Sequence, residues 1–246
     1  TPIKSSAASD VYKRQFYNNK LEEIIFPDTQ VEFGENVFYE CNNLKRVILP
    51  DWMTVIPGGM FSFCHGLEDV IFPDGLKEIS ATAFWGSPLK EINLQEGLET
   101  IGNLSFSLGN FESITLPASV KSIGSGAFNS AKPVKYIWSM AVEPPKCDRW
   151  NYPKIFASDI PVYVPVGSGE KYRVAENWGY FKNFIEVDDF STVGIDNVTC
   201  TDDAELPVEV YTVAGRRVYA GQISHAELPA GIYIVKSPAG SYKIIR

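Results

Sequence analysis

The chain has 246 residues, 45% of them apolar, and a formal net charge of −8 at pH 7. This length and apolar content suffice for one or two domains with cores of their own. The acidic balance argues against nucleic-acid binding, which needs a basic surface stripe. No apolar run approaches the roughly 18–20 residues of a membrane span, and four scattered cysteines are too few for a disulfide scaffold.

The first 15 residues match no position of the repeat that follows them. The string SSAASDVYKRQ resembles a translated sequencing-adapter artefact, and it lacks the apolar region of a signal peptide. We therefore expect residues 1–15 to be a non-repeat segment that is foreign to the array; the alternative is a natural, irregular N-terminal cap. Phe16 lies 22 residues before Phe38, so it fits the Phe position of an earlier repeat copy.

From Leu21 onward the chain repeats one pattern at steps of 23, 23, 22, 22 and 23 residues. The copies begin at Leu21, Leu44, Leu67, Leu89, Phe111 and Val134. Position 4 is apolar in every copy and position 6 is apolar in the first five, with Ser139 in the sixth. This is the period-2 spacing of a short strand with one buried face. Position 13 is Phe or Ile in the first five copies. Position 18 is Phe in every full copy, namely Phe38, Phe61, Phe84, Phe106 and Phe128.

A unit of this length cannot bury its apolar face alone, so the copies must stack into a solenoid with a continuous core. The pattern L-x-x-I-x-L-P…L-x-x-I-x-x-x-A-F-x-x-C/N resembles the BspA-like class of leucine-rich repeat, which is found in bacterial surface proteins. The resemblance implies a mainly β, right-handed leucine-rich repeat solenoid with a parallel sheet on its concave face. The pattern departs from the common leucine-rich repeat because it lacks the Asn at the turn after L-x-L.

The sixth copy, from Val134, loses the pattern after its strand. Residues 160–187 then resemble the closing segment of this family: a strand, a helix near residues 169–178, and a last strand. Such a cap shields the open end of a repeat stack. We expect the solenoid to span residues 16–190, with its cap from about residue 140.

Two columns of the repeat carry charge. Position 2 alternates in sign and reads Glu22, Lys45, Glu68, Lys90, Glu112 and Lys135. Adjacent rungs of a parallel sheet lie ~4.8 Å apart, so this column predicts a self-neutralising ladder rather than a ligand patch of one sign. Position 8 stacks like charges, Asp28, Asp51, Asp74 and Glu96. Each carboxylate either caps its own turn or shares a Ca²⁺ ion, although the Gly-Asp pattern of calcium-binding β-rolls is absent.

Tyr136 and Trp138, at positions 3 and 5 of the sixth strand, place two large aromatic side chains on exposed positions of the concave face. Such side chains are frequent in binding hot spots. They are therefore the main candidates for ligand contact; the alternative is that they cover the capping segment. Arg46, on the same face, and Trp52 and Trp85, in turns, are the further candidates.

No group of residues predicts catalysis, a metal or a cofactor. The two histidines, His65 and His225, lie in separate regions, and no nucleophile, phosphate-loop, zinc or dinucleotide motif is present. Cys41 and Cys64 share position 21 on adjacent rungs, near enough in principle for a disulfide, but parallel side chains give poor geometry. We expect two reduced, buried thiols and a loop position for His65.

After residue 190 the period is lost, and short alternating runs are broken by Ala-Gly turns. This pattern predicts a small antiparallel β-domain over residues 191–246. The runs VEVYTVAGRRV, LPAGIYIVK and YKIIR resemble the C-terminal sorting domain of the bacterial type IX secretion system. The resemblance implies secretion machinery as a partner, and a location outside the cell or on the outer-membrane surface of a Gram-negative bacterium.

These features together predict a non-catalytic, secreted or surface-attached repeat protein that binds a protein or glycan on its concave face. The BspA-like family includes adhesins that recognise host matrix proteins, so the resemblance implies adhesion. The alternative is a fragment of a larger secreted protein, in which an upstream domain is catalytic or binds glycans and the repeats are a spacer.

Overall fold

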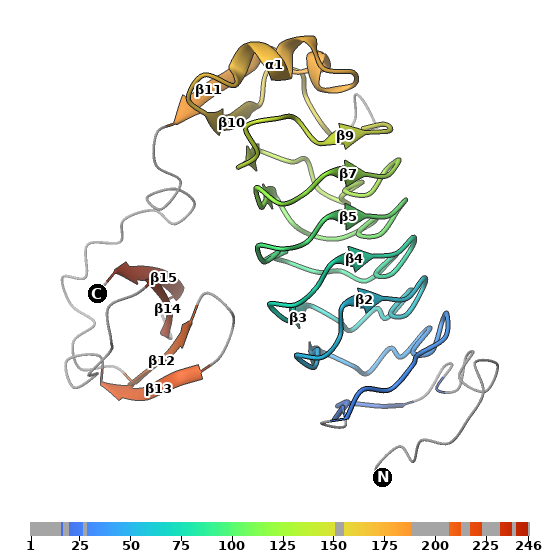
Figure 1. The fold of residues 1–246 in the computed structure, drawn as a ribbon. Helices are drawn as coiled ribbons and strands as arrows, with labels where there is room; N and C mark the ends of the chain where they lie inside the picture. The colour runs from blue at the N-terminus through green and yellow to red at the C-terminus, as the bar shows by residue number, and fades with distance from the viewer. Residues whose placement is uncertain are drawn as a thin grey trace. The chain divides into compact units, whose positions relative to one another are not determined.

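The protein is described by a computed structural model that covers Phe16, residues 20–26, 29–150 and 155–187, and the backbone of four strands between residues 207 and 245. The chain forms two compact units, Thr1–Asp188 and Asp189–Arg246. The first unit is a coil whose turns stack along one axis (Figure 1). The segment predicted to be foreign, residues 1–15, and Asp28 lie outside the described residues.

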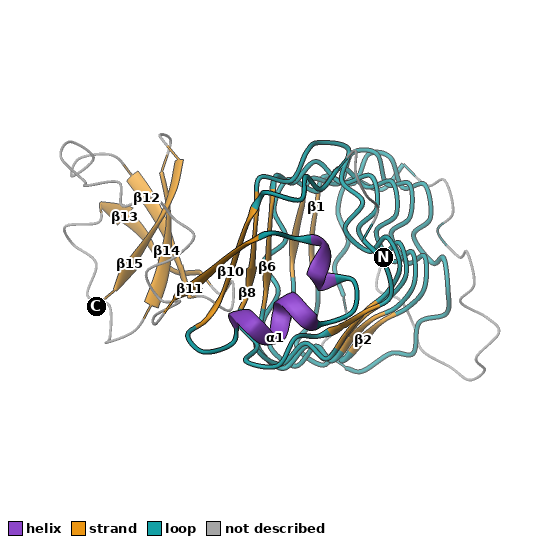
Figure 2. Ribbon diagram, turned by 90° about the horizontal axis from the view of Figure 1, so that it is seen from above, coloured by secondary structure: helices purple, strands orange, loops and turns teal. Residues whose placement is uncertain are grey.

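Parallel strands line two sides of this coil. One side holds β1 (Arg46–Ile48), β3 (Asp69–Ile71), β6 (Ser113–Leu116), β8 (Tyr136–Ser139), β10 (Pro161–Pro165) and β11 (Asn183–Val187). The other holds β2 (Val55–Ile56), β4 (Glu78–Ile79), β5 (Thr100–Ile101), β7 (Ser122–Ile123) and β9 (Lys146–Cys147). The view down the stack separates the two sides (Figure 2). The prediction of a mainly β solenoid is confirmed, and we keep the name concave face for the solvent side of the first set.

The strand register follows the sequence period. Val47 lies beside Val70, and Ile114 lies beside Ile137, so position 4 of one copy meets position 4 of the next. In β1 and β6, these position-4 side chains are buried while their immediate neighbours are at least partly exposed. Alternation within the strand therefore sets the face, and the repeat length sets the register.

The Phe residues at position 18 form a continuous stack inside the coil. Phe84 lies between Phe61 and Phe106, with ring centroids 5.4 Å away on each side and interplanar angles of 9° and 1°. Phe16 stacks on Phe38 at 5.3 Å and 12°, which confirms its assignment to an earlier copy. The stack therefore runs through every full copy and supplies the spine of the core.

A left-handed backbone recurs at position 16 in all five copies. The residues are Asn36, Gly59, Thr82, Leu104 and Gly126, with φ between 55° and 63°. Gly and Asn tolerate this conformation. Leu104 and the β-branched Thr82 are strained in it. Because position 16 holds Asn, Gly, Thr or Leu in different copies, the sequence pattern does not predict the left-handed turn.

We expect Thr82→Gly to stabilise the solenoid by about 0.5–1 kcal/mol, because Gly adopts a positive φ without a steric penalty. The matched control is Ala81→Gly, one residue earlier and outside the left-handed positions, which should cost about 0.5–1 kcal/mol through added chain entropy. Urea denaturation of both variants measures the two changes. Destabilisation by Thr82→Gly that equals the control would contradict this account of the turn.

The concave sheet is interrupted in the fourth copy, where residues 90–95 form no strand. In the regular pair, the Leu49 N–H donates to the Ile71 carbonyl. The Asn93 carbonyl holds the equivalent place, but it accepts a hydrogen bond from the Gln95 side-chain amide at 3.0 Å. Gln95 stands where the first, second, third and fifth copies have Pro, and its side-chain amide supplies this local donor. A two-stranded and a four-stranded sheet result.

The predicted cap is present as β10, α1 (Gly169–Val174), a 3₁₀ turn (Trp178–Tyr180) and β11. The helix ends at Val174, earlier than expected, because Ala175 takes an extended backbone with φ −70° and ψ 140°. Trp178 is fully buried and donates its indole N–H to the Pro145 carbonyl at 2.8 Å. Gly167 and Gly169 donate their N–H groups to the Glu186 carboxylate, which lowers the pKa of Glu186.

The second unit is a four-stranded antiparallel sheet in the order β13-β12-β14-β15. Its strands are β12 (Pro207–Thr212), β13 (Arg217–Gln222), β14 (Ile232–Ser237) and β15 (Gly240–Ile245). The expected antiparallel arrangement is confirmed by the pairing of β12 with β13 and β14, and of β14 with β15. His225 lies outside the described residues.

Candidate functional site

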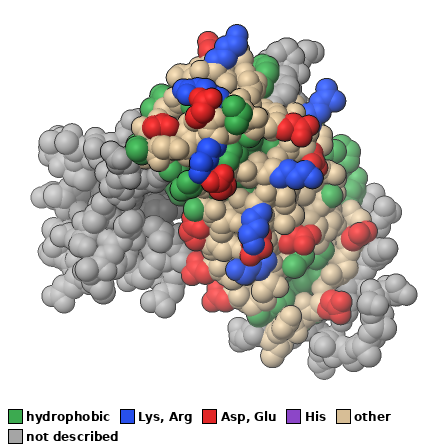
Figure 3. All heavy atoms as spheres, turned by 45° about the horizontal axis from the view of Figure 1, so that its top comes forward, with side chains coloured by type: hydrophobic (Ala, Val, Ile, Leu, Met, Phe, Trp, Pro, Cys, Tyr) green, Lys and Arg blue, Asp and Glu red, His purple; other side chains and the backbone are tan. Residues whose placement is uncertain are grey.

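Ion pairs cross the rungs of the concave face as the position-2 alternation predicts. Lys90 pairs with Glu68, and Lys135 pairs with Glu112. The hydrogen bond and charge of Lys135 lower the pKa of Glu112, and Glu112 raises the pKa of Lys135. Several acidic and basic side chains lie next to one another on the face that Figure 3 shows. Such exposed pairs contribute little to stability, because water and salt screen them.

An aromatic cluster lies on the concave face where the repeats meet the cap. Trp138 on β8 stacks on Tyr163 of β10, with ring centroids 3.6 Å apart and an interplanar angle of 8°. Tyr136 meets both rings edge-on at 6.4 Å. Ile185 follows Tyr163 in the same row and is 37% exposed. We call Tyr136, Trp138, Tyr163 and Ile185 the aromatic patch.

The expectation that Trp138 is exposed is wrong, since only 7% of it is accessible. The physical reason is the extra rung: β10 pairs with β8 and lays the Tyr163 ring over the indole. Trp138 is therefore a buried packing partner of Tyr163, in line with the alternative that it covers the capping segment. Tyr136 remains half-buried, with part of its ring open to solvent.

The other three candidates are not brought together with the patch. Arg46 lies at the far end of the concave face, paired with Asp69 at 2.9 Å. Trp52 is half-buried and stacks on Phe33 at 6.1 Å. Trp85 is half-buried against Phe63 at 4.7 Å.

Sequence analysis missed Tyr163 and Ile185. Both lie in the cap, where the repeat period no longer applies. The alternation in IPVYVP was the available signal, because it places Tyr163 opposite the buried Val162 and Val164. Pairing of β10 with β8 then puts Tyr163 directly beside Trp138.

The structure shows what one carboxylate of the position-8 column, Glu96, contacts. Glu96 accepts the backbone N–H groups of Ala118 and Ser119 at 2.8 and 3.2 Å, so it caps the turn of the next copy rather than its own. Within residues 20–26, 29–150 and 155–187, no group of three or more potential ligands could hold a metal ion.

Cys41 and Cys64 are buried thiols that are not joined in a disulfide, as expected. Cys64 donates its S–H to the Phe38 carbonyl at 3.0 Å. The side-chain hydrogen bond between Cys64 and Cys41, together with burial, raises the pKa of Cys64, so this thiol stays protonated. His65 is an exposed turn residue, as expected.

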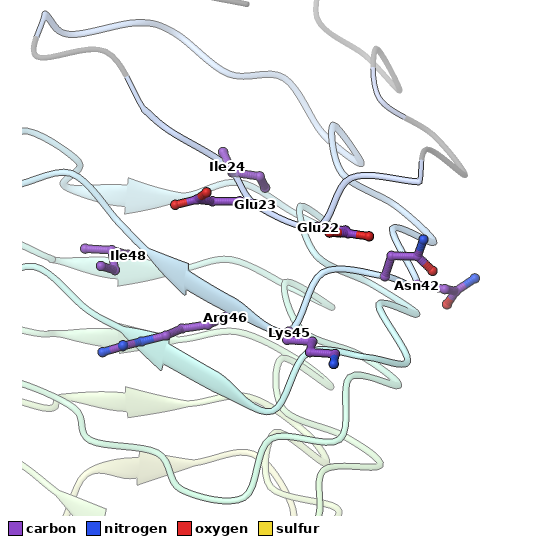
Figure 4. A pocket seen from close by; sticks show the side chains of 8 residues that line it. Glu22, Glu23, Ile24, Asn42, Lys45, Arg46 and Ile48 are labelled. Atoms are coloured by element: carbon purple, nitrogen blue, oxygen red, sulfur yellow. The ribbon is translucent and has the colours of Figure 1, made fainter. Parts of the chain in front are cut away.

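Two grooves flank the first repeat copy, and neither includes the aromatic patch. The larger, about 810 Å³, lies on the concave side between Glu22 and Glu23 of the first copy and Lys45 and Arg46 of the second (Figure 4). The smaller, about 620 Å³, lies on the side of β2 and is lined in part by Trp52.

In the part of the chain with described structure, no helix has the length and apolar character needed to cross a membrane. A family model described as a BspA type leucine rich repeat region matches residues 9–135 in six copies, which is more than half of the 246 residues. A comparison with curated proteins finds no match.

Three solved structures are similar in part. A leucine-rich repeat protein from T. pallidum is 23% identical, with a TM-score of 0.46 over 70% of this chain and 72% of that one. A leucine-rich repeat protein from Bacteroides ovatus is 22% identical, with a TM-score of 0.39 over 69% and 56%. A leucine rich cell surface protein from Faecalibacterium prausnitzii is 19% identical, with a TM-score of 0.38 over 73% and 69%.

Proposed function

Because this chain belongs to the BspA-type leucine-rich repeat family, we propose that it is a scaffold that binds another protein through the aromatic patch on its concave face. The observation that carries this proposal is the clustering of three aromatic rings and an exposed Ile on adjacent strands. Half-buried Tyr side chains supply large contact area at little cost in conformational entropy.

The surroundings of the patch favour a protein partner. Ser113 and Thr115 of β6 lie beside Tyr136 and Trp138, which adds hydroxyl groups next to the apolar rings. This combination of an aromatic centre with a polar rim is typical of protein interfaces. The nearby charges are paired across the rungs, so we expect the affinity to depend only weakly on salt.

A glycan partner is less well supported by the geometry. Sugar rings stack on open, flat aromatic faces, whereas one face of Trp138 is covered by Tyr163 at 3.6 Å. Next along the row, Ile185 flanks Tyr163 on the side away from Trp138. The rings therefore offer edges and an aliphatic neighbour, which suit apolar protein side chains.

We expect Tyr136→Ala to weaken binding by at least about tenfold, as truncation of an interface hot spot does. The measurement is surface plasmon resonance of the full chain on a panel of immobilised extracellular-matrix glycoproteins. Tyr39→Ala is the matched control, because Tyr39 is also half-buried but packs edge-on against Phe63 at 5.5 Å, away from the patch.

The outcomes separate the parts of the proposal. Equal affinity for Tyr136→Ala and the unchanged protein would remove the patch from the interface. Binding that is lost on enzymatic deglycosylation of the panel would assign a glycan ligand. If the unchanged protein binds no member of the panel, recognition of matrix proteins is contradicted, while the family assignment stays intact.

We further propose that the protein acts outside the cell or at the bacterial outer surface, and that the second unit directs its export by the type IX secretion system. The support is the resemblance of its last strands to that sorting domain, and the absence of repeat periodicity in this unit. Without residues 193–246, we expect the protein to stay in the periplasm of a host that has this machinery. Fractionation of cells with the full and shortened chains tests this, and surface delivery of the shortened chain would contradict it.

A further inference from the structure

The strand β1 has an edge that no described backbone group occupies. The opposite edge, to which the Lys45 carbonyl points, pairs with the next rung: the Asp69 N–H donates to the Lys45 carbonyl at 3.4 Å. In a parallel ladder, bonds alternate between the two edges residue by residue. Arg46 and Ile48 therefore direct their N–H and C=O groups toward residues 21–26, the entry segment. No backbone hydrogen bond joins the described entry segment to β1.

The larger groove lies in this gap. Glu22 and Glu23 of the entry segment form one wall, and Lys45, Arg46 and Ile48 form the other (Figure 4). No ion pair of 4.0 Å or less links these described walls. Ile48 is 57% exposed, which is unusual for an aliphatic residue next to an open strand edge.

The apolar side chains of the entry segment are already in place. Ile24 and Phe26 pack against the core, and Phe26 meets Phe38 edge-on at 6.1 Å. The Phe16–Phe38 stack joins the same copy to the preceding one at 5.3 Å. The entry segment thus lacks only its backbone ladder and its outward side-chain pairs.

We propose that the entry segment is a strap that closes onto the free edge of β1 as a parallel strand, in the register dictated by the 23-residue period. The outward pairs in this register are Glu22 with Lys45, Glu23 with Arg46, and Ile25 with Ile48. Closure completes the alternating charge ladder and covers Ile25, which is 81% exposed in the open form. It also pairs the free N–H and C=O groups on this edge of β1.

The charges of the two walls identify the entry segment itself as the occupant. Glu22 and Glu23 face the cations Lys45 and Arg46, so the walls attract each other. A foreign strand inserted between them would hold both pairs apart. Exposed ion pairs are screened by salt, so high ionic strength shifts the strap toward the open form. This switch acts at the first copy and does not rest on the proposed binding role of the aromatic patch.

Amide hydrogen exchange of the full chain, resolved by residue with NMR, tests the strap. The Leu49 amide, bonded to the Ile71 carbonyl at 3.0 Å, is the internal reference. At low salt the Arg46 and Ile48 amides should be protected to within about tenfold of Leu49. Exchange of these two amides at the rate of unstructured peptide would overturn the proposal.

Charge variants test the register. Glu22→Lys should speed exchange at Arg46 and Ile48 by about fivefold, because it replaces an attraction to Lys45 with a repulsion. Adding Lys45→Glu should restore protection. Glu68 faces position 45 in both forms, so its repulsion of the new carboxylate does not alter closure.

The control is Glu32→Lys, which makes the same net-charge change in the same copy but on the side of the smaller groove. It should leave the Arg46 and Ile48 amides unchanged. An equal effect of Glu32→Lys and Glu22→Lys, or no rescue by Lys45→Glu, would overturn the register.

Discussion

Replacing Phe84 with Ala should lower the free energy of unfolding by about 3–5 kcal/mol, as the loss of a buried Phe side chain does. Phe84 is fully buried, and it separates two parallel rings at 5.4 Å on each side. Phe72 also contacts it edge-on at 5.8 Å. Its removal leaves a gap that neither neighbouring ring can fill, because each is held by its own rung.

Urea denaturation followed by circular dichroism measures this change. A repeat stack is stabilised by contacts between nearest neighbours, so a break in a central rung should also reduce cooperativity and the slope of the transition. Trp52→Ala is the control, since Trp52 is half-buried and stacks on Phe33, which is itself only partly buried. It should cost no more than about 2 kcal/mol. Equal midpoint shifts for the two variants would contradict the spine.

Replacing Trp178 with Ala should cost about 3–5 kcal/mol and loosen the cap. The indole is fully buried, with Trp150 and Tyr172 edge-on at 5.1 and 5.0 Å. The substitution also leaves the Pro145 carbonyl without its 2.8 Å donor, which adds the penalty of a buried unsatisfied group. The last turns of the solenoid should then lose protection first.

Thermal unfolding and hydrogen exchange of Trp178→Ala check this result. The control is Val174→Ala in the same cap, where the side chain is 76% exposed and the cost should be within about 0.5 kcal/mol. A melting temperature that is lowered equally by both variants would show that Trp178 does not anchor the cap.

The solenoid could be predicted from the sequence because its core is periodic. A Phe every 22 or 23 residues must stack if the copies stack, and Phe16 joins this column even though its own strand is not visible in the sequence. At the interrupted fourth copy, the Gln95 side-chain amide donates to the Asn93 carbonyl, which offers this carbonyl a local partner besides the neighbouring rung. No period encodes this contact.

The candidate site could be predicted only in part for the same reason. Tyr136 and Trp138 stand out within the repeat, but the burial of Trp138 depends on Tyr163, which lies 25 residues later in the non-periodic cap. Contacts between a periodic and a non-periodic segment need the strand pairing, which the structure supplies. The pairing also adds Ile185 to the same row.

Site-specific photo-cross-linking tests the central claim, protein binding by the concave face, most directly. In one variant, benzoylphenylalanine would replace Thr115, which lies on β6 beside Trp138 of β8. In the other it would replace Thr100, an equally half-buried Thr on β5 at the other side of the coil. Each full-length variant would be irradiated with a matrix glycoprotein that binds the unchanged chain. We expect a covalent adduct from position 115 and none from position 100. An adduct from position 100 alone would place the partner on the opposite side and contradict the account.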